Sequence, residues 1–189
     1  MCTGHLIEKW LAAIFVFMST EQTGPTAPTL DQARRQIARY GLAADPRAVL
    51  VATRLMAAGA LLDRASEVHF ARFGLSTGRY RLLADLEDCG GEKSPSRLAR
   101  SLGVSRATVT GLVNGLEREG LVARRASAED GRGAVVVLTA RGDRRLRDMA
   151  ADHFARLQAL VGALSAEERD VFLDLLGRIT GGVGALTAD

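Results

Sequence analysis

The sequence is poor in cysteine, in aromatic residues and in lysine. Its 189 residues include two cysteines, and because Cys2 and Cys89 lie far apart they form no disulfide framework, which favours a reducing compartment. Aromatic residues make up 5% of the chain, so leucine, valine and alanine must form most of the core. The apolar run Leu11–Met18 is far shorter than the about 20 residues that cross a bilayer. We therefore predict a cytoplasmic protein without a membrane segment.

The first 45 residues carry few structural signals. Residues 18–30 are rich in threonine and proline, which is typical of a linker. Glu8 and Lys9 precede the apolar run and no small-residue cleavage site follows it, so the run does not fit a signal peptide. We expect residues 1–45 to be a disordered extension, and residues 1–17 to be non-essential and to arise from an upstream start codon.

The small net charge of +3 hides an uneven distribution. The segment 91–147 carries 12 basic and 6 acidic residues, a net charge of +6, whereas the rest of the chain is slightly acidic. A basic middle segment between nearly neutral flanks indicates contact with a polyanion.

Apolar residues recur at helical spacing over most of the chain after Pro46. Serines precede several of the expected helices and glycines follow them, as N-caps and C-terminal stops do. Helices are predicted over about 46–74, 76–90, 94–103, 105–120, 143–164 and 165–182. Residues 184–189 are expected to be a tail, and a hairpin between the fourth and fifth helices is the one sheet that the sequence predicts.

The segment 94–120 has the pattern of a helix-turn-helix. Two short helices meet at Gly103, and Ser105 caps the second, which in this motif enters the DNA major groove. One side of that helix is apolar and would face the core: Val109, Leu112, Val113 and Leu116. The opposite side carries small and polar residues that can approach base edges: Ala107, Thr110, Gly111, Asn114 and Arg118, with Arg106 flanking. A helical hairpin with a solvated polar face is the alternative.

A basic hairpin, Arg124–Thr139, follows directly. A two-stranded ribbon is marginal alone, so this one must lean on the preceding helices. After a recognition helix such a hairpin is a wing, and an arginine at its tip can enter the narrow minor groove. Asp130 cannot favour DNA by charge and would hold a nearby arginine in place. A generic solvated turn is the alternative for the tip.

The segment 97–142 resembles the MarR family of winged-helix transcription regulators. The family pattern is a helix-turn-helix, then Leu-Glu-x-x-Gly-Leu-Val, an Asp-x-Arg wing tip and Leu-Thr-x-x-Gly. This chain supplies Leu116–Val122, Asp130–Arg132 and Leu138–Gly142. In helix order the resemblance spans about residues 47–183, and residues 1–45 fall outside it.

The resemblance implies a winged helix-turn-helix over about 76–140 within a domain 46–183. Helices at about 46–74 and 143–183 would form a homodimer that binds a pseudo-palindromic site on double-stranded DNA, usually as a repressor. The candidate DNA-binding residues are Ser105, Arg106, Ala107, Thr110, Asn114, Arg124, Arg125, Asp130 and Arg132. A small lipophilic or phenolic effector would bind between head and dimer helices, and its pocket residues would be Leu62, Ser66, His69, Phe70, Tyr80 and Leu83.

Other classes of function have little support in the sequence. We find no phosphate-binding loop, nucleophile elbow or zinc-protease motif, so no enzyme activity and no cofactor are expected. The histidines and cysteines lack metal-ligand spacing. The carboxylate of Asp88 beside Cys89 does not favour the reactive thiolate form, which disfavours redox sensing. A winged-helix adapter that binds another protein instead of DNA stays open.

Overall fold

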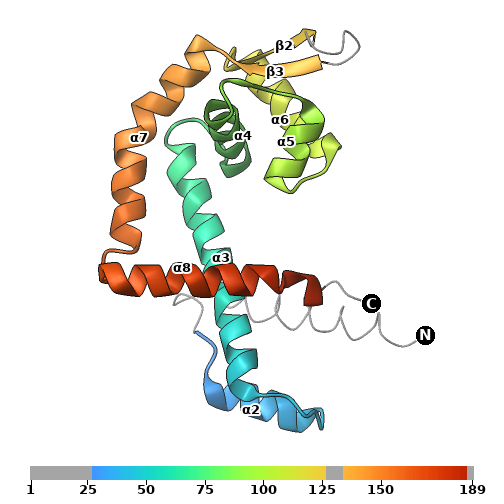
Figure 1. Cartoon of the computed structure of the whole chain (residues 1–189), viewed down its shortest axis with the longest axis vertical. Coiled ribbons are helices and arrows are strands. Elements are labelled where there is room, and N and C mark those ends of the chain that lie inside the picture. The colour runs from blue at the N-terminus through green and yellow to red at the C-terminus, as the bar shows by residue number, and fades with distance from the viewer. Residues whose placement is uncertain (1–26, 127–133, 187–189) are drawn as a thin grey trace, which may run out of the picture. The chain divides into compact units, whose positions relative to one another are not determined.

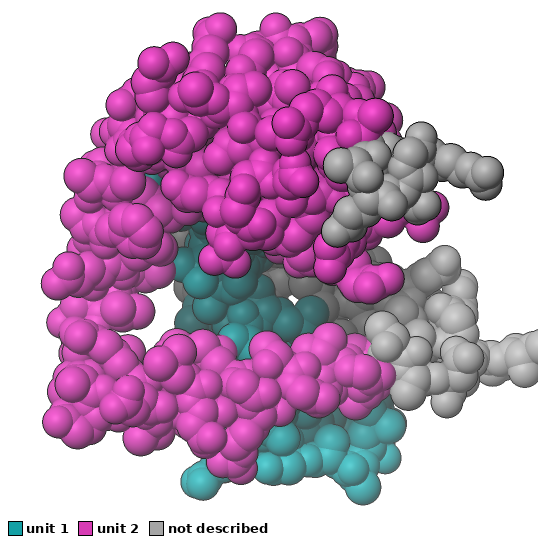
Figure 2. All heavy atoms as spheres, turned by 45° about the horizontal axis from the view of Figure 1, so that its top comes forward, with its two compact units in different colours: residues 1–71 teal, residues 72–189 magenta. Residues whose placement is uncertain are grey.

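The computed structural model describes residues 27–126 and 134–186. The chain divides into two compact units, residues 1–71 and residues 72–189, coloured separately in Figure 2. Most described residues are helical, and three short strands form a small antiparallel sheet (Figure 1). This architecture confirms the predicted mainly helical fold with a small β-wing. Within the described ranges, no helix combines the length and the apolar composition that crossing a bilayer requires.

The first unit contains α2 (Leu30–Arg39) and α3 (Pro46–Ala71), which pack against each other. The presence of α2 corrects the expectation that residues 1–45 lack structure. Thr29 and Gln32 form a reciprocal capping box at the start of α2, which satisfies backbone N–H groups that a helix end leaves without partners. Ala33 is buried, so packing as well as capping holds the helix in place.

The second unit begins with helices that start where serine caps are predicted. It contains α4 (Thr77–Asp88), β1 (Glu92–Lys93), α5 (Pro95–Leu102), α6 (Arg106–Arg118), β2 (Val122–Ala126), β3 (Ala134–Leu138), α7 (Ala140–Leu160), α8 (Ala166–Gly181) and the 3-10 turn Val183–Leu186. Ser76, Ser94 and Ser105 each accept a backbone N–H at the start of α4, α5 and α6. The capping predictions are therefore confirmed.

The sheet has the strand order β1-β3-β2, with β3 antiparallel to both neighbours. β2 and β3 are the predicted hairpin. The prediction that this hairpin forms the whole sheet is wrong, because Glu92 and Lys93 pair with Val137 and Val136. A two-residue strand carries no periodic signal, and its pairing with β3 gives the marginal hairpin a third strand.

The winged head, defined as residues 77–138, shares one apolar core with the first half of α7. The fully buried side chains come from α4, α5, α6, the sheet and α7, and the largest are Leu82, Leu83, Leu86, Leu98, Leu116, Leu121 and Met149. Gly103 joins α5 to α6 in the left-handed region, with φ of 67°, where a residue with a Cβ is strained. The tight turn and the shared core fix α6 on the head.

α7 begins at Ala140, earlier than the predicted start at 143. Thr139 is its N-cap and accepts from the backbone N–H of Gly142, so Gly142 lies inside the first turn. A Cβ on Gly142 would collide with the carbonyl oxygen of Leu121 and lie 2.7 Å from Leu138 Cδ1. Gly142 is therefore a close-packing position and not a signal for a helix start.

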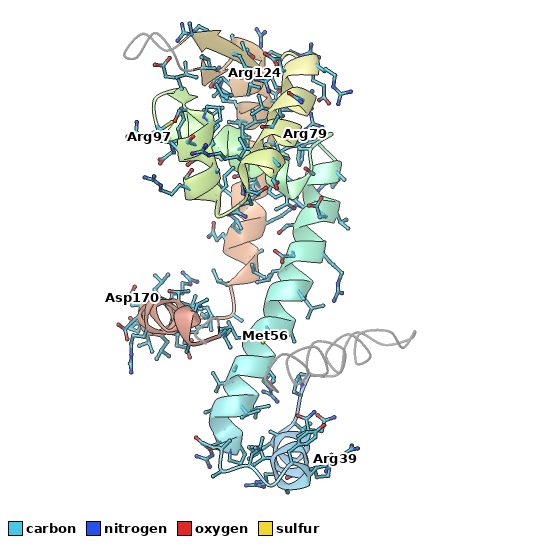
Figure 3. All side chains as sticks on the ribbon, turned by 90° about the vertical axis from the view of Figure 1, so that its right-hand side faces the viewer. Arg39, Met56, Arg79, Arg97, Arg124 and Asp170 are labelled. Atoms are coloured by element: carbon cyan, nitrogen blue, oxygen red, sulfur yellow. The ribbon has the colours of Figure 1, made fainter. Side chains whose placement is uncertain are left out.

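The second half of α7 leads away from the winged head to α8 (Figure 1). No residue of α8 is buried, although the helix contains three leucines, one phenylalanine, one valine and one isoleucine. In Figure 3, which looks along this helix near Asp170, its side chains radiate outward on all sides. A capping box at Ser165 and Glu168 supports the helix locally.

Candidate nucleic-acid interface

α6 separates its residues into a buried apolar side and an exposed polar side. Val109, Val113 and Leu116 are at most 1% exposed, which anchors the helix to the core of the winged head. The exposed positions of α6 include Arg106, Ala107, Thr110, Gly111, Asn114 and Arg118. The structure thus brings the predicted base-reading residues together on one face of one helix.

Two hydroxyl groups near the start of α6 are engaged by the helix itself. Ser105 Oγ accepts from the backbone N–H of Thr108 and lies 2.8 Å from Thr108 Oγ1. Thr110 Oγ1 donates to the carbonyl oxygen of Arg106 at 2.9 Å. With its proton committed in this way, the Thr110 hydroxyl has lone pairs left for an external hydrogen-bond donor.

Arg124, at the base of the wing on β2, contacts α6 instead of standing free. Its Nη2 donates to Asn114 Oδ1 at 2.6 Å, and its Nη1 donates to the Glu117 carboxylate. The backbone N–H of Arg124 also donates to Glu117 Oε1 at 3.1 Å. Figure 3 shows Arg124 within the winged head. Glu117 was not among the predicted site residues, and its motif position, Leu-Glu-x-x-Gly, was the available signal.

Arg125 is also paired with a glutamate. Its Nη2 lies 2.5 Å from Glu92 Oε2, and both side chains are more than half exposed. Exposed ion pairs contribute little stability, so this contact mainly lowers the free positive charge of the wing base. Both arginines that made the hairpin look basic are therefore balanced by carboxylates within the chain.

The helix-turn-helix carries positive charge on α5 and α6 that is not balanced by a carboxylate. Within residues 27–126 and 134–186, Arg97, Arg100, Arg106 and Arg118 form no ion pair with a carboxylate. Arg118 Nε donates to the backbone oxygen of Asn114 at 3.3 Å, which leaves its charge unbalanced. Arg97 and Arg100 were not predicted as site residues, because their exposure depends on how α5 packs. Figure 3 labels Arg97 on the outer side of α5.

The wing tip lies outside the described residues. Asp130 and Arg132 belong to the segment 127–133, so their predicted roles stay predictions.

The predicted effector residues lie in both units. Leu62, Ser66, His69 and Phe70 lie on α3 of the first unit, and Tyr80 and Leu83 lie on α4 of the second. Leu83 belongs to the buried core, whereas Leu62 is 44% exposed.

Of the six candidate effector residues, Tyr80 has a defined ring contact and a shifted pKa. Its ring meets that of His153 edge-on at 4.9 Å. Burial raises the pKa of the Tyr80 phenol above its ordinary value, and the negative charge of Glu87 raises it further. The hydroxyl therefore stays protonated at neutral pH. In the described part of the chain, no cluster of histidine, cysteine and carboxylate side chains is suited to hold a metal ion.

The comparisons with known proteins agree with this geometry. Residues 73–133 match the MarR family. The HTH-type transcriptional repressor YetL of Bacillus subtilis is 38% identical over 117 residues, which cover 61% of this chain and 70% of YetL. The chain belongs to the MarR family. It is a transcription regulator that binds DNA and not an enzyme.

Solved structures of family members share the fold. AbsC, a MarR family transcriptional regulator from Streptomyces coelicolor, aligns with a TM-score of 0.67 and 25% identity over 76% of this chain and 97% of AbsC. The PcaV transcriptional regulator of the same organism, solved in complex with its natural ligand, aligns with a TM-score of 0.59 and 25% identity over 74% of this chain and 96% of PcaV. The fold prediction is thereby confirmed independently of the sequence motifs.

Proposed function

We propose that this protein is a cytoplasmic repressor that binds a pseudo-palindromic operator as a homodimer and releases it when a small effector binds. The observation that carries the proposal is the exposed face of α6. Because the core fixes the buried side of α6, the polar side of the helix is positioned before DNA binds. The named function of YetL as a transcriptional repressor supports the direction of regulation.

The distribution of charge supports an arrangement of this face on the duplex. Arg106, Ala107, Thr110 and Asn114 would meet the major groove, and Arg97, Arg100 and Arg118 would neutralise phosphates beside it. Phosphate neutralisation supplies most of the sequence-independent affinity of such proteins. Asp130 and Arg132 would act at the minor groove, as the family pattern suggests.

The apolar surface of α7 and α8 supports homodimer formation. Phe154, Leu157 and Leu160 in α7 are 65%, 45% and 59% exposed. α8 and the 3-10 turn after it expose a larger set: Val171, Phe172, Leu173, Leu175, Ile179, Val183 and Leu186. So many exposed large apolar side chains on neighbouring elements favour an interface, and a two-fold partner would match the symmetry of a palindromic site.

An effector site is supported by the family and by the chemistry of Tyr80. PcaV was solved with its natural ligand, and in this chain Tyr80, on α4, is the candidate residue whose chemistry suits such a ligand. A protonated tyrosine can donate to a carboxylate, and it can both donate to and accept from a phenolic hydroxyl. We therefore propose a small lipophilic or phenolic effector.

The proposal is tested by fluorescence anisotropy with DNA from immediately upstream of the gene and with a scrambled duplex, over a range of salt concentrations. We expect tight binding to the first and weak, salt-sensitive binding to the second. Arg106→Ala should weaken both, whereas the matched variant Arg39→Ala, on α2, should weaken neither. A protein that binds no duplex at low salt would contradict the proposal and favour the adapter alternative.

A further inference from the structure

The side chain of Asn114 is held by a neighbour from another element. It lies in the middle of the exposed face of α6, and Arg124 of β2 donates to its Oδ1 at 2.6 Å. The same guanidinium donates to the Glu117 carboxylate one turn further along α6. The three residues form a cluster that joins the recognition helix to the wing.

This cluster determines which way the Asn114 amide faces. A guanidinium group has five N–H donors and no acceptor, so the amide atom that it contacts must be the oxygen. The Asn114 nitrogen is then directed away from Arg124. Among the residues that the structure describes, no hydrogen bond occupies that nitrogen. The amide therefore presents its NH2 group outward from the face of α6.

Orientation of the amide affects what Asn114 can read. Asparagine distinguishes adenine by a bidentate contact, in which its oxygen accepts from N6 and its nitrogen donates to N7. Here a charge-assisted bond from Arg124 occupies one of the two lone pairs of the oxygen. Such bonds are the strong ones, so an adenine N6 group would have to share the oxygen with a fixed cation. The contact also polarises the amide, which makes the NH2 group a better donor.

Because Glu117 neutralises the charge of Arg124, this arginine is suited to holding a neighbouring side chain in position and not to binding a phosphate. The Glu117 side chain meets Arg124 both at the guanidinium and at the backbone N–H. The charge of Arg124 is therefore balanced in place, in contrast to Arg106 on the same surface. With its charge balanced by Glu117, Arg124 directs a second N–H donor, from Nη2, to Asn114.

We propose that Arg124 is a positioning residue that fixes Asn114 as a hydrogen-bond donor, so that α6 reads a major-groove acceptor at that base step and makes no bidentate contact with adenine. The acceptors of this class are purine N7, guanine O6 and thymine O4. The inference rests on the proposed function, since it specifies what one residue of the DNA-binding face recognises. It also reassigns Arg124 from contacting DNA to orienting a residue that does.

The test selects binding sites for the full-length protein from a library of random duplexes and compares four proteins: wild type, Asn114→Ala, Arg124→Met and Arg125→Met. Asn114→Ala identifies the base step that Asn114 reads. Arg124→Met keeps an unbranched apolar stem and removes the donors, so base preference at that step should fall about 5-fold or more. Arg125→Met is the matched control, because Arg125 pairs with Glu92 and not with α6; it should leave that preference unchanged.

Base analogues then separate a donor from a bidentate contact. We expect guanine or thymine at the step, or an adenine whose N6 amino group can be removed with less than about 2-fold loss of affinity, whereas 7-deaza substitution costs about 5-fold or more. A strict adenine whose N6 group matters as much as N7 would overturn the inference. An unchanged preference in Arg124→Met, with thermal stability like that of wild type, would overturn it as well.

Salt dependence distinguishes positioning from phosphate contact. Arg97→Gln, at a proposed phosphate contact, should lower the slope of log affinity against log salt by about 1 per protomer, or about 2 for the dimer, and Arg124→Gln should leave the slope unchanged. An equal decrease for both variants would show that Arg124 binds phosphate and would contradict the positioning role. If wild type selects no sequence at all, the proposed function itself fails, which is a different result from selection with unaltered preference.

Discussion

α6 and α8 are both amphipathic helices of the second unit, but α6 buries its apolar side and α8 leaves its apolar residues exposed. α6 buries Val109, Val113 and Leu116 almost completely and exposes polar side chains. α8 buries none of its residues and exposes Phe172 and Leu173 by 46% and 66%. The position of α6 is therefore determined within the protomer, whereas α8 lacks the packing that would determine its position.

This difference matches the two partners of the proposed function, which are DNA for α6 and a second protomer for α8. A helix that reads DNA must be rigid before binding, since every degree of freedom lost at the interface reduces affinity. A helix that forms a dimer instead gains its stability from the partner, because burying a large apolar side chain contributes about 1.5–3 kcal/mol. The predictions below test the two helices against each other.

The largest effect is expected from a charge in the apolar surface of α8. In a two-fold dimer each substitution occurs twice, so Phe172→Asp should cost about 3–6 kcal/mol of dimerisation free energy. Sedimentation should then find monomers, and binding to the operator should fall with the dimer. Asp170→Asn, on the same helix, is the matched control and should leave the dimer intact.

Hydrogen exchange on the Phe172→Asp variant should show different behaviour for α6 and α8. Backbone amides of α8 should lose protection, because the helix has no packing of its own, and those of α6 should keep it. A Phe172→Asp protein that stays dimeric, or whose α8 stays protected as a monomer, would contradict this account of α8.

The next effect concerns the apolar anchor of α6. Leu116 is 0% exposed, and Leu116→Ala should lower the free energy of unfolding by about 2–5 kcal/mol through the lost contacts and the cavity. Thr110→Ala, on the exposed side, should change it by less than about 0.5 kcal/mol while weakening DNA binding. Urea denaturation would measure the stability of both variants, and anisotropy would measure their DNA binding. A large loss of stability in Thr110→Ala would contradict the assignment of packing to the buried side of α6 and DNA contact to the exposed side.

A smaller effect is expected where α7 begins. Gly142→Ala places a methyl group against the Leu121 carbonyl and the Leu138 side chain, and such overpacking costs about 1–3 kcal/mol. A Cβ added to Gly115, inside α6, would meet no atom within 4 Å outside the backbone of its own helix. Gly115→Ala should therefore raise stability by about 0.5–1 kcal/mol, the ordinary gain from glycine to alanine in a helix. Thermal melts that show the same sign for both variants would contradict the close-packing role of Gly142.

Local signals in the sequence predicted most of the helices, and tertiary contacts account for what was missed. The caps Ser76, Ser94 and Ser105 act within three residues of themselves, so a sequence pattern can reveal them. α2 was missed although Thr29 and Gln32 form the same type of local signal. β1 has no local signal, because its two residues become a strand by pairing with β3, more than 40 residues away.

The sequence predicted which residues form the exposed face of α6, but it did not predict the ion pairs that two of the candidate arginines make. The helical wheel placed Thr110 and Asn114 on one exposed face of α6. The same reading treated Arg124 and Arg125 as free positive charges. Their partners, Glu117 and Glu92, lie 7 and 33 residues away, and only the arrangement of α6 and the sheet brings them within reach.

The smallest effect tests whether Ser105 supports α6 or reads DNA, since it was predicted as a DNA-binding residue. Its Oγ accepts from the Thr108 backbone N–H at 3.1 Å, so Ser105→Ala should cost about 1 kcal/mol of stability through the lost cap. Ser105→Asp should restore the cap and the stability, because aspartate is an equally good N-cap, but its negative charge beside the phosphates should weaken DNA binding. Urea denaturation and anisotropy would measure the two effects. A Ser105→Ala protein with unchanged stability and no operator binding would mean that Ser105 contacts DNA directly, and the preformed face of α6 would then depend on its packing alone.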